Sequence, residues 1–208
     1  MISGTRTPAR REFLLRQAPA LALLAAARPA RAFALPELMT LLAARRSGEA
    51  RFTEERFVQG LDAPLHSSGT LSFAAPDRLV RRTLSPRPES MVVEGNTLTL
   101  TRGGRSRSFA LDAVPEMVAL VEAIRGTLTG NAASLARHFR TRLSGDAERW
   151  LLELQPLDAQ LARQLRSVQI GGRRDEVRSV ETLLAGGDRA TMAIEPVRAA
   201  PLAASAPP

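Results

Sequence analysis

The fold is decided by residues 67–100, SSGTLSFAAPDRLVRRTLSPRPESMVVEGNTLTL. This stretch contains four short runs of strand-forming residues, each followed by residues that favour turns. The runs are Ser68–Ala74, Arg78–Leu84, Ser90–Glu94 and Thr97–Thr101. Short runs bounded by Gly, Pro, Asn and Asp are typical of hairpins, and Gly95-Asn96 is a connector that tolerates the positive φ of a tight turn. The stretch therefore predicts an antiparallel meander.

Two segments carry the spacing of amphipathic helices. Leu35–Ser47 has Pro36 and Glu37 in its first turn, where a fixed φ and a negative charge both favour a helix. Val114–Leu128 has apolar residues at helical spacing, and Asn131 can cap a further short helix. The apolar stripes of these predicted lid helices, which must cover an apolar surface, are formed by Leu38, Met39, Leu42, Met117, Leu120, Val121 and Ile124.

Strand signals dominate the remaining sequence. Further strands are predicted at Ala50–Leu61, Ser106–Leu111, His138–Leu143, residues 150–154, Val168–Ile170, Glu176–Leu184 and Arg189–Glu195. Ala50–Leu61 holds both Phe52 and Phe57, so we expect a bulge or a change of face between them, with a helix as the alternative. Asp158–Leu165 can form a helix of one or two turns.

About eleven strands and three helices, without βαβ alternation, predict an α+β fold with one large antiparallel sheet. A sheet of this size usually curls because twist accumulates from strand to strand. We therefore expect a curled sheet whose concave side is covered by the two amphipathic helices. The predicted domain spans residues 33–198, and the Ala-, Pro- and Ser-rich tail from Ala199 to Pro208 is expected to be disordered.

Residues 1–32 have the organisation of an export signal. A basic segment ends in Arg10-Arg11-Glu12-Phe13-Leu14, an apolar run spans Ala18–Ala27, and Ala30-Arg31-Ala32 is a small-x-small cleavage site. The arginine pair resembles a twin-arginine signal, and an ordinary secretory signal is the alternative. The apolar run is shorter than the roughly 20 residues that a membrane anchor needs. We expect a mature protein that begins near Phe33 and resides in the periplasm.

The net charge of +8 is concentrated in the predicted signal. Residues 1–32 hold six arginines and one glutamate, which leaves 23 basic and 20 acidic residues for the remainder. A nucleic-acid-binding domain should keep its basic surface in the mature protein, so no nucleic-acid partner is expected. Arg81-Arg82 and Arg173-Arg174 are expected to be solvated positions of strands or turns. The absence of cysteine excludes disulfides, thiolate metal sites and a cysteine nucleophile.

The sequence offers little for catalysis. His66 and His138 are the only histidines, and neither has a second histidine or a carboxylate at metal-ligand spacing. His66 lies beside Ser67-Ser68, but no Gly-x-Ser-x-Gly elbow surrounds either serine. No glycine loop that could hold a phosphate precedes a helix. We expect no catalytic residue, no metal and no cofactor, and the protein is predicted not to be an enzyme.

An excess of apolar residues on the predicted strands is the informative feature. Alternating apolar positions would give the curled sheet a hydrophobic inner face beneath the helices. The predicted wall of this face consists of Phe52, Leu71, Phe73, Val93, Leu98, Leu100, Phe109, Trp150 and Leu152. Such a face can pack into a dry core, as most apolar stripes do, or enclose a cavity for an apolar ligand.

The order of several short motifs points to a family. The motifs are Ala50-Arg51-Phe52-Thr53-Glu54, Ser68–Phe73 followed by Pro76, Leu84-Ser85-Pro86, Glu89-Ser90, Val92–Leu98, Trp150–Pro156, and a final strand through Met192 and Ile194. Over residues 33–197 they resemble the LolA family of periplasmic outer-membrane lipoprotein carriers. The resemblance implies an unclosed β-barrel covered by a lid of about three helices, with a hydrophobic cavity between them. It also implies an acylated lipoprotein as cargo, an inner-membrane exporter and an outer-membrane receptor as partners, and a lipid-binding role for the predicted wall.

The sequence departs from that family at two positions. Phe52-Thr53-Glu54 replaces the family's Phe-x-Gln motif, and Ala75 stands where many members have an arginine that latches the lid by hydrogen bonds. We therefore expect a divergent, monomeric member whose cargo is a lipoprotein or another acylated lipid. The alternatives are a sensor that uses the same fold to engage a regulatory protein and an enzyme that acts on an envelope lipid.

Overall fold

The computed structural model describes residues 33–113 and 115–197, so the predicted export signal at 1–32 and the predicted tail at 199–208 lie outside the described residues. The helices are α1 Leu35–Ala43, η1 Leu111–Ala113 (a 3-10 turn), α2 Pro115–Leu128, α3 Ala132–His138 and α4 Ala159–Ala162. The first strands are β1 Ser47–Phe57, β2 Leu65–Ala74, β3 Arg78–Ser85, β4 Glu89–Glu94, β5 Thr97–Arg102 and β6 Arg105–Ala110. The later strands are β7 Phe139–Asp146, β8 Arg149–Pro156, β9 Leu165–Arg173, β10 Glu176–Leu184 and β11 Arg189–Pro196.

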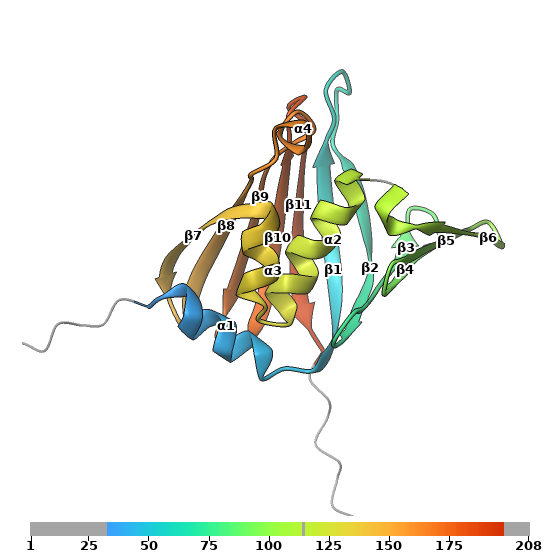
Figure 1. Cartoon of the computed structure of the whole chain (residues 1–208). Coiled ribbons are helices and arrows are strands. Elements are labelled where there is room, and N and C mark those ends of the chain that lie inside the picture. The colour runs from blue at the N-terminus through green and yellow to red at the C-terminus, as the bar shows by residue number, and fades with distance from the viewer. Residues whose placement is uncertain (1–32, 114, 198–208) are drawn as a thin grey trace, which may run out of the picture. The chain divides into compact units, whose positions relative to one another are not determined.

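The eleven strands form one antiparallel sheet (Figure 1). Its order is β6-β5-β4-β3-β2-β1-β11-β10-β9-β8-β7, so it consists of two meanders. The strands β1 and β11 join the meanders, with Phe52 opposite Ile194. Among the described residues β6 and β7 do not pair, so the barrel is unclosed. The predicted α+β fold with one large antiparallel sheet is confirmed.

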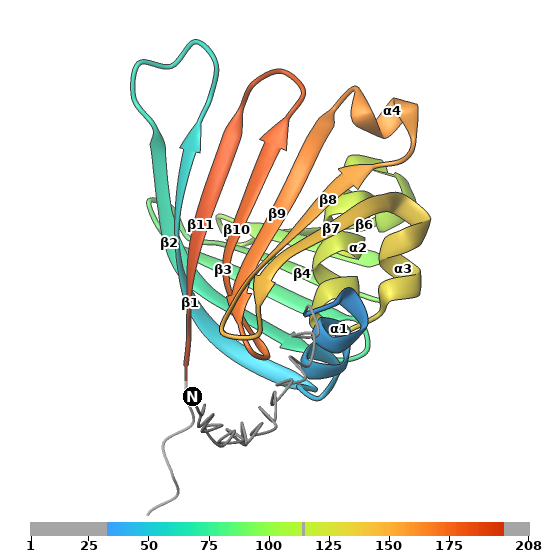
Figure 2. The same cartoon turned by 90° about the vertical axis from the view of Figure 1, so that its left-hand side faces the viewer.

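The helices lie on the concave side of the sheet. Figures 1 and 2 show α1, α2 and α3 side by side within the curl, whereas α4 lies at the end of the sheet where β8 leads into β9. Asn131 caps α3 as predicted, because its side-chain oxygen accepts a hydrogen bond of 2.9 Å from the backbone N–H of Ser134. None of the described helices is long and apolar enough to cross a membrane.

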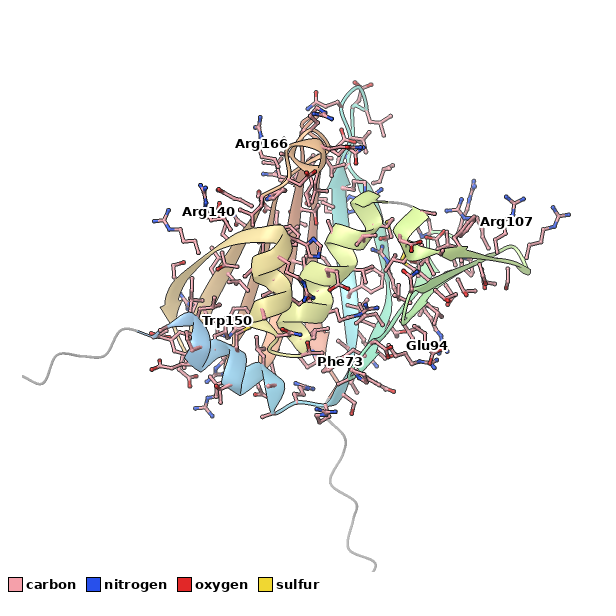
Figure 3. All side chains as sticks on the ribbon, in the orientation of Figure 1. Phe73, Glu94, Arg107, Arg140, Trp150 and Arg166 are labelled. Atoms are coloured by element: carbon pink, nitrogen blue, oxygen red, sulfur yellow. The ribbon has the colours of Figure 1, made fainter. Side chains whose placement is uncertain are left out.

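Two groups of buried side chains hold the helices to the sheet. The larger group joins α1, α2 and α3 to the second meander and includes Leu38, Met39, Leu42, Ala123, Leu135, Phe139, Trp150, Leu152, Leu154, Val168 and Ile170. The smaller group joins α2 to the first meander and consists of Val93, Leu98, Leu111 and Val121. Trp150 satisfies its indole N–H in the core by donating to the Arg174 carbonyl oxygen at 2.9 Å. Arg107, Arg140 and Arg166 instead point away from the core into solvent (Figure 3).

The structure decides between the bulge and the change of face that were predicted for β1. Its register is continuous with β2 from Ser47 to Arg56 and with β11 from Ala50 to Phe57, so no bulge separates the two phenylalanines. Phe52 and Phe57 lie on opposite faces because they are an odd number of positions apart in a strand of period two; Phe52 is buried and Phe57 exposed. Helix α1 also ends at Ala43 rather than at Ser47, since Ser47 already pairs with β2.

Gly69 is a point at which β2 closely approaches β3. A Cβ atom on Gly69 would lie 1.9 Å from the carbonyl oxygen of Arg82 and 3.0 Å from the ring of Phe52. The register of β2 and β3 shifts by a bulge between Ser68 and Gly69. A residue without a side chain is therefore required here, both for the bulge and for the buried position of Phe52.

Candidate functional site

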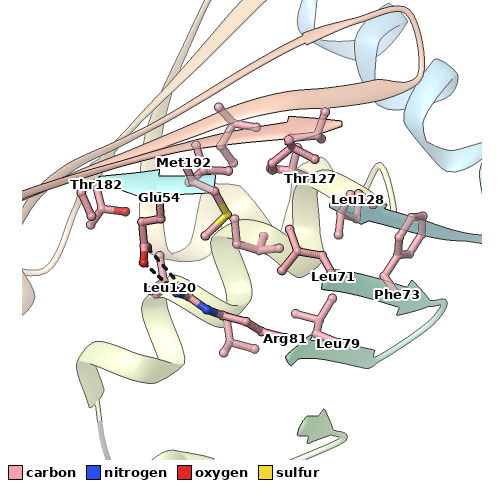
Figure 4. A pocket seen from close by; sticks show the side chains of 18 of the residues that line it. Glu54, Leu71, Phe73, Leu79, Arg81, Leu120, Thr127, Leu128, Thr182 and Met192 are labelled. Atoms are coloured by element: carbon pink, nitrogen blue, oxygen red, sulfur yellow. Dashed lines mark hydrogen bonds and ion pairs between the residues drawn. The ribbon is translucent and has the colours of Figure 1, made fainter. Parts of the chain in front are cut away.

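A cavity of about 660 Å³ lies between the curled sheet and helix α2. The helix contributes one wall, and strands of both meanders contribute the others (Figure 4). The sheet side of the lining is mainly apolar and includes Leu71, Phe73, Leu79, Met91, Val93, Ile170, Val177, Val180, Met192 and Ile194. The volume falls in the range of roughly 300–1,000 Å³ that is typical of small-molecule sites. The cavity can therefore hold an apolar ligand of substantial size.

Half of the residues predicted for the wall and the lid line this cavity. From the helices they are Leu42, Met117, Leu120, Val121 and Ile124, and from the sheet they are Leu71, Phe73 and Val93. The five helix residues come from α1 and α2 and face the interior in this structure. Strands β2 and β4 of the first meander supply the three sheet residues.

The other predicted residues lie outside the cavity lining. Leu38, Met39, Trp150 and Leu152 are buried in the larger core group, and Leu98 is buried in the smaller one. Phe52 is buried beneath the guanidinium of Arg81. Leu100 and Phe109 are 36% and 42% exposed, because β5 and β6 extend beyond the part of the sheet that the helices cover.

The lining residues of β10 and β11 were missed by the sequence analysis. Val177 and Val180 both line the cavity although they are three positions apart, because the register shifts between Val177 and Ser179. Beyond this bulge the lining positions alternate normally, through Thr182 and Leu184. Only the period-two pattern of β11, with Met192 and Ile194, could have been found without knowing the register.

A charged pair, Glu54 on β1 and Arg81 on β3, lies in the wall of this apolar cavity (Figure 4). Arg81 donates from Nη1 to Glu54 Oε1 at 3.1 Å and from Nη2 to Glu54 Oε2 at 2.6 Å. Ser67 on β2 donates to Glu54 Oε2 at 3.0 Å and accepts from Arg81 Nη2 at 3.3 Å. The expectation that Arg81 is solvated is therefore wrong, because its side chain is only 26% exposed and is paired across three strands.

The surroundings of Glu54 favour its charged form. Burial by itself would raise the pKa of this carboxyl group, but the hydrogen bonds and the positive charge of Arg81, together with the bond from Ser67, hold the pKa below its ordinary value. Arg56 adds the smallest of the electrostatic effects on Glu54. Glu54 and Arg81 thus form a neutral but strongly polar pair within the cavity wall.

Helix α2 is also bound to the sheet by polar contacts. Arg125 Nη2 donates to the carbonyl oxygens of Asp77, at 3.1 Å, and Gly95, at 2.9 Å, which lie in the turns β2–β3 and β4–β5. Its Nη1 donates to Glu122, which in turn accepts from Ser134 of α3. Ala75, which replaces the latching arginine of the LolA family, lies in the same β2–β3 turn. In this chain the arginine that connects helix and turn comes from the helix.

The described residues offer no grouped metal ligands. Within 33–113 and 115–197, no three His, Asp or Glu side chains are placed so that they could hold a metal ion. His66 is exposed on β2 and His138 ends α3, and neither lines the cavity. The cavity chemistry is therefore mainly that of apolar binding, with the Glu54–Arg81 pair in its wall and further charged side chains in the lining, among them Arg56 and Arg189.

Comparisons with solved structures find proteins of related fold. A LolA superfamily protein from Nitrosomonas europaea matches with a TM-score of 0.43 and 10% identity, over 82% of this chain and 96% of that one. A putative outer membrane lipoprotein-sorting protein domain from Vibrio parahaemolyticus matches with a TM-score of 0.42 and 8% identity, over 81% of this chain and 93% of that one. MucB in the MucA/MucB complex of Pseudomonas aeruginosa matches with a TM-score of 0.44 and 16% identity, over 81% of this chain and 59% of that one.

A comparison with curated proteins finds no match. The likeness to the solved structures is distant, so the family assignment rests on the sequence. A family model described as outer membrane lipoprotein carrier protein LolA-like matches residues 25–206, which is most of the chain. This match agrees with the resemblance found in the short motifs, and the chain belongs to the family of LolA-like outer membrane lipoprotein carrier proteins.

Proposed function

We propose that this protein is a periplasmic carrier that shields the acyl chains of a lipoprotein or of a related envelope lipid and transfers them from the inner to the outer membrane. The observation that carries the proposal is the apolar cavity of about 660 Å³ between α2 and the sheet. An acyl chain gains ~0.8 kcal/mol for each methylene group that leaves water. About ten buried methylene groups would therefore supply ~8 kcal/mol, enough for binding without any covalent step.

The positions of α1 and α2 suit a removable cover. Both helices expose apolar residues to the cavity, and α2 is bound to the hairpin turns through Arg125. A few hydrogen bonds of this kind contribute about 1.5–3 kcal/mol each when the donor is charged. The cover can therefore close over a ligand and still be opened by a partner. We propose an inner-membrane exporter as donor and an outer-membrane receptor as acceptor.

Two further features support the periplasmic part of the proposal. The family to which the chain belongs is described by its role as an outer membrane lipoprotein carrier. Residues 1–32 have the charge, the apolar run and the small-x-small motif of an export signal. The carrier acts by binding and release alone, and no described side chain is assigned a catalytic role.

Titration with a fluorescent fatty acyl probe tests the proposal, and the cavity provides a matched pair of variants. Leu71→Arg places a charge in the cavity wall and is expected to weaken probe binding at least about tenfold, because an unpaired charge is costly in an apolar site. Leu100→Arg makes the same change at a position outside the cavity lining and should alter binding less than about twofold. Mass spectrometry of the protein purified from the periplasm should also find bound acyl lipid.

Two results would contradict the carrier. One is the absence of saturable probe binding, and the other is equal binding by both arginine variants and the wild type. A stable complex with a membrane-bound regulatory protein, without lipid, would instead favour the sensor. Hydrolysis of an envelope lipid that is lost in His66→Ala or His138→Ala would favour the enzyme.

A further inference from the structure

The charged pair Glu54–Arg81 has no role in binding an acyl chain alone. A hydrocarbon chain gains nothing from a carboxylate and a guanidinium, and both groups lose hydration in the cavity wall. The side chain of Glu54 is only 9% exposed. A cross-strand contact between β1 and β3 could be made by apolar residues without this cost. The position of the pair in the lining points to a polar group on the ligand.

The Arg81 guanidinium is fixed in place by its neighbours. One of its faces lies over the Phe52 ring, with 4.6 Å between Cζ and the ring centroid. Phe52 is itself held by Gly69, where a Cβ atom would come within 3.0 Å of its ring. A guanidinium restrained on one face by an aromatic ring and on one edge by a carboxylate is a pre-organised hydrogen-bond donor.

Arg81 retains donors that the protein does not use. Of its five N–H groups, one on Nη1 and the two on Nη2 are engaged by Glu54 and Ser67. The Nε–H group and the second Nη1–H group have no acceptor within residues 33–113 and 115–197. Because Arg81 lines the cavity, a ligand oxygen can accept from it.

The charge of the pair decides which oxygen is favoured. Glu54 already neutralises Arg81, and its own pKa is held below the ordinary value, so it remains an anion at neutral pH. A ligand carboxylate would meet the repulsion of Glu54 and lose its hydration, whereas an uncharged carbonyl oxygen meets neither penalty. Three further arginines line the cavity. Arg56 and Arg189 are exposed, so water and salt screen their charges, and Arg45 is paired with Glu176.

We propose that Arg81 binds the carbonyl oxygen of an ester- or amide-linked acyl chain, and that Glu54 excludes free fatty acids from the same cavity. The proposal rests on the proposed carrier function and names its substrate class. The selectivity suits a carrier in an envelope, because free fatty acids would otherwise compete for the same apolar volume. Acyl chains that are attached to a protein or to glycerol through an ester or an amide always carry the carbonyl oxygen to which Arg81 would donate.

Competition against the fluorescent acyl probe at pH 8 tests this selectivity. The competitors are dodecanoate, its methyl ester, its N-methyl amide and dodecane, which share one chain length. The wild type is expected to bind the ester and the amide about tenfold more tightly than dodecanoate. Glu54→Gln keeps the shape of the side chain but leaves Arg81 without its anion, so dodecanoate should become the best competitor. Arg82→Met, at the exposed neighbouring position of β3, should leave the order of the competitors unchanged.

A double variant separates recognition from folding. Arg81→Met alone would leave Glu54 buried without a cation and could unfold the chain, so it is combined with Glu54→Gln. This double variant is expected to bind the ester and dodecane with affinities that differ by less than about twofold. Urea unfolding shows whether each variant is folded.

The outcomes distinguish this inference from the carrier function. If the wild type binds no probe, the carrier proposal fails. If it binds the probe but shows the same affinity for ester and carboxylate, the carrier stands and the selectivity is wrong. The selectivity is also wrong if the double variant keeps the preference for the ester over dodecane, or if Glu54→Gln leaves dodecanoate a weak competitor.

Discussion

Arg125 Nη2 on helix α2 donates a hydrogen bond of 2.9 Å to the carbonyl oxygen of Gly95, in the turn that the sequence Gly95-Asn96 predicts between β4 and β5. The same nitrogen donates to the Asp77 carbonyl oxygen, so one side chain holds α2 to two turns of the first meander. Only backbone oxygens accept these bonds. The contact therefore depends on the presence of one arginine in the helix and on the shape of the turns.

Replacing Arg125 is expected to loosen α2. Arg125→Met keeps much of the aliphatic volume but removes the bonds to both turns, so the free energy of unfolding should fall by about 2–4 kcal/mol. Release of a bound acyl probe should also become faster, because α2 covers the cavity. Stopped-flow dilution measures the release, and urea titration measures the stability. The control is Arg140→Met, at an exposed position of β7. It should leave both the rate of probe release and the free energy of unfolding nearly unchanged. Unchanged release in Arg125→Met would show that α2 does not limit ligand exit.

The tight approach of β2 to β3 predicts a severe effect at one glycine. In Gly69→Ala the new methyl group would lie 1.9 Å from a backbone oxygen, which cannot move without parting the two strands. We expect a loss of at least about 3 kcal/mol or failure to fold. Thermal unfolding measures the effect. Gly186→Ala is the matched control, because no atom lies within 4 Å of the added carbon and the φ of Gly186 is not positive. Equal stability of the two variants would contradict the described register.

The lowered pKa of Glu54 predicts a pH dependence. A carboxyl group with a lower pKa in the folded than in the unfolded protein stabilises the fold above the unfolded value, and this contribution is lost as the pH falls toward the folded value. Glu54→Gln removes the contribution. The stability difference between wild type and variant should therefore be constant near neutral pH and should shrink as the pH falls below the ordinary value of 4.5. Urea unfolding between neutral and acidic pH measures it, and parallel curves for the two proteins would refute the assignment.

Filling the cavity should separate binding from stability. Met192→Trp adds volume at a residue that lines the cavity, so acyl probe affinity should fall at least about fivefold while the free energy of unfolding changes by less than about 1 kcal/mol. Met39→Trp makes the same substitution in the dry core, where Met39 is 4% exposed, and is expected to cost about 1–3 kcal/mol or more. Fluorescence titration and urea unfolding of both variants give the comparison. Equal destabilisation by the two substitutions would mean that the cavity does not admit added volume.

The local signals in the sequence predicted most of the fold. Turn residues placed the first meander, since Gly95 does adopt a positive φ and Asn131 does cap a helix. These features depend on residues that are neighbours in the chain, so a pattern of a few positions contains them. The number of strands followed from the same signals, whereas the unclosed barrel was implied by the resemblance to the LolA family.

The lining of the cavity could be predicted only in part, because it depends on which strand segment the helices cover. Leu98 and Leu100 have the same place in the alternation of β5, yet Leu98 packs against α2 and Leu100 lies opposite Arg107, partly in solvent. Glu54 was not among the predicted wall residues, although it lines the cavity. Its partner, Arg81, is 27 positions away, and nothing in the local pattern connects the two.

The pairing of β1 with β11 places the beginning and the end of the domain side by side at the centre of the sheet. Phe52 and Ile194, which face each other there, are separated by most of the domain's length. Contacts of such long range form slowly, because a large loop must close before they contribute. The two meanders can each form early, but they cannot join until Arg189–Pro196 has been synthesised. A chain that ends before Arg189 is therefore expected to expose the unpaired edge of β1, which can pair with another chain and aggregate. The last strand is thus needed to protect the protein from aggregation.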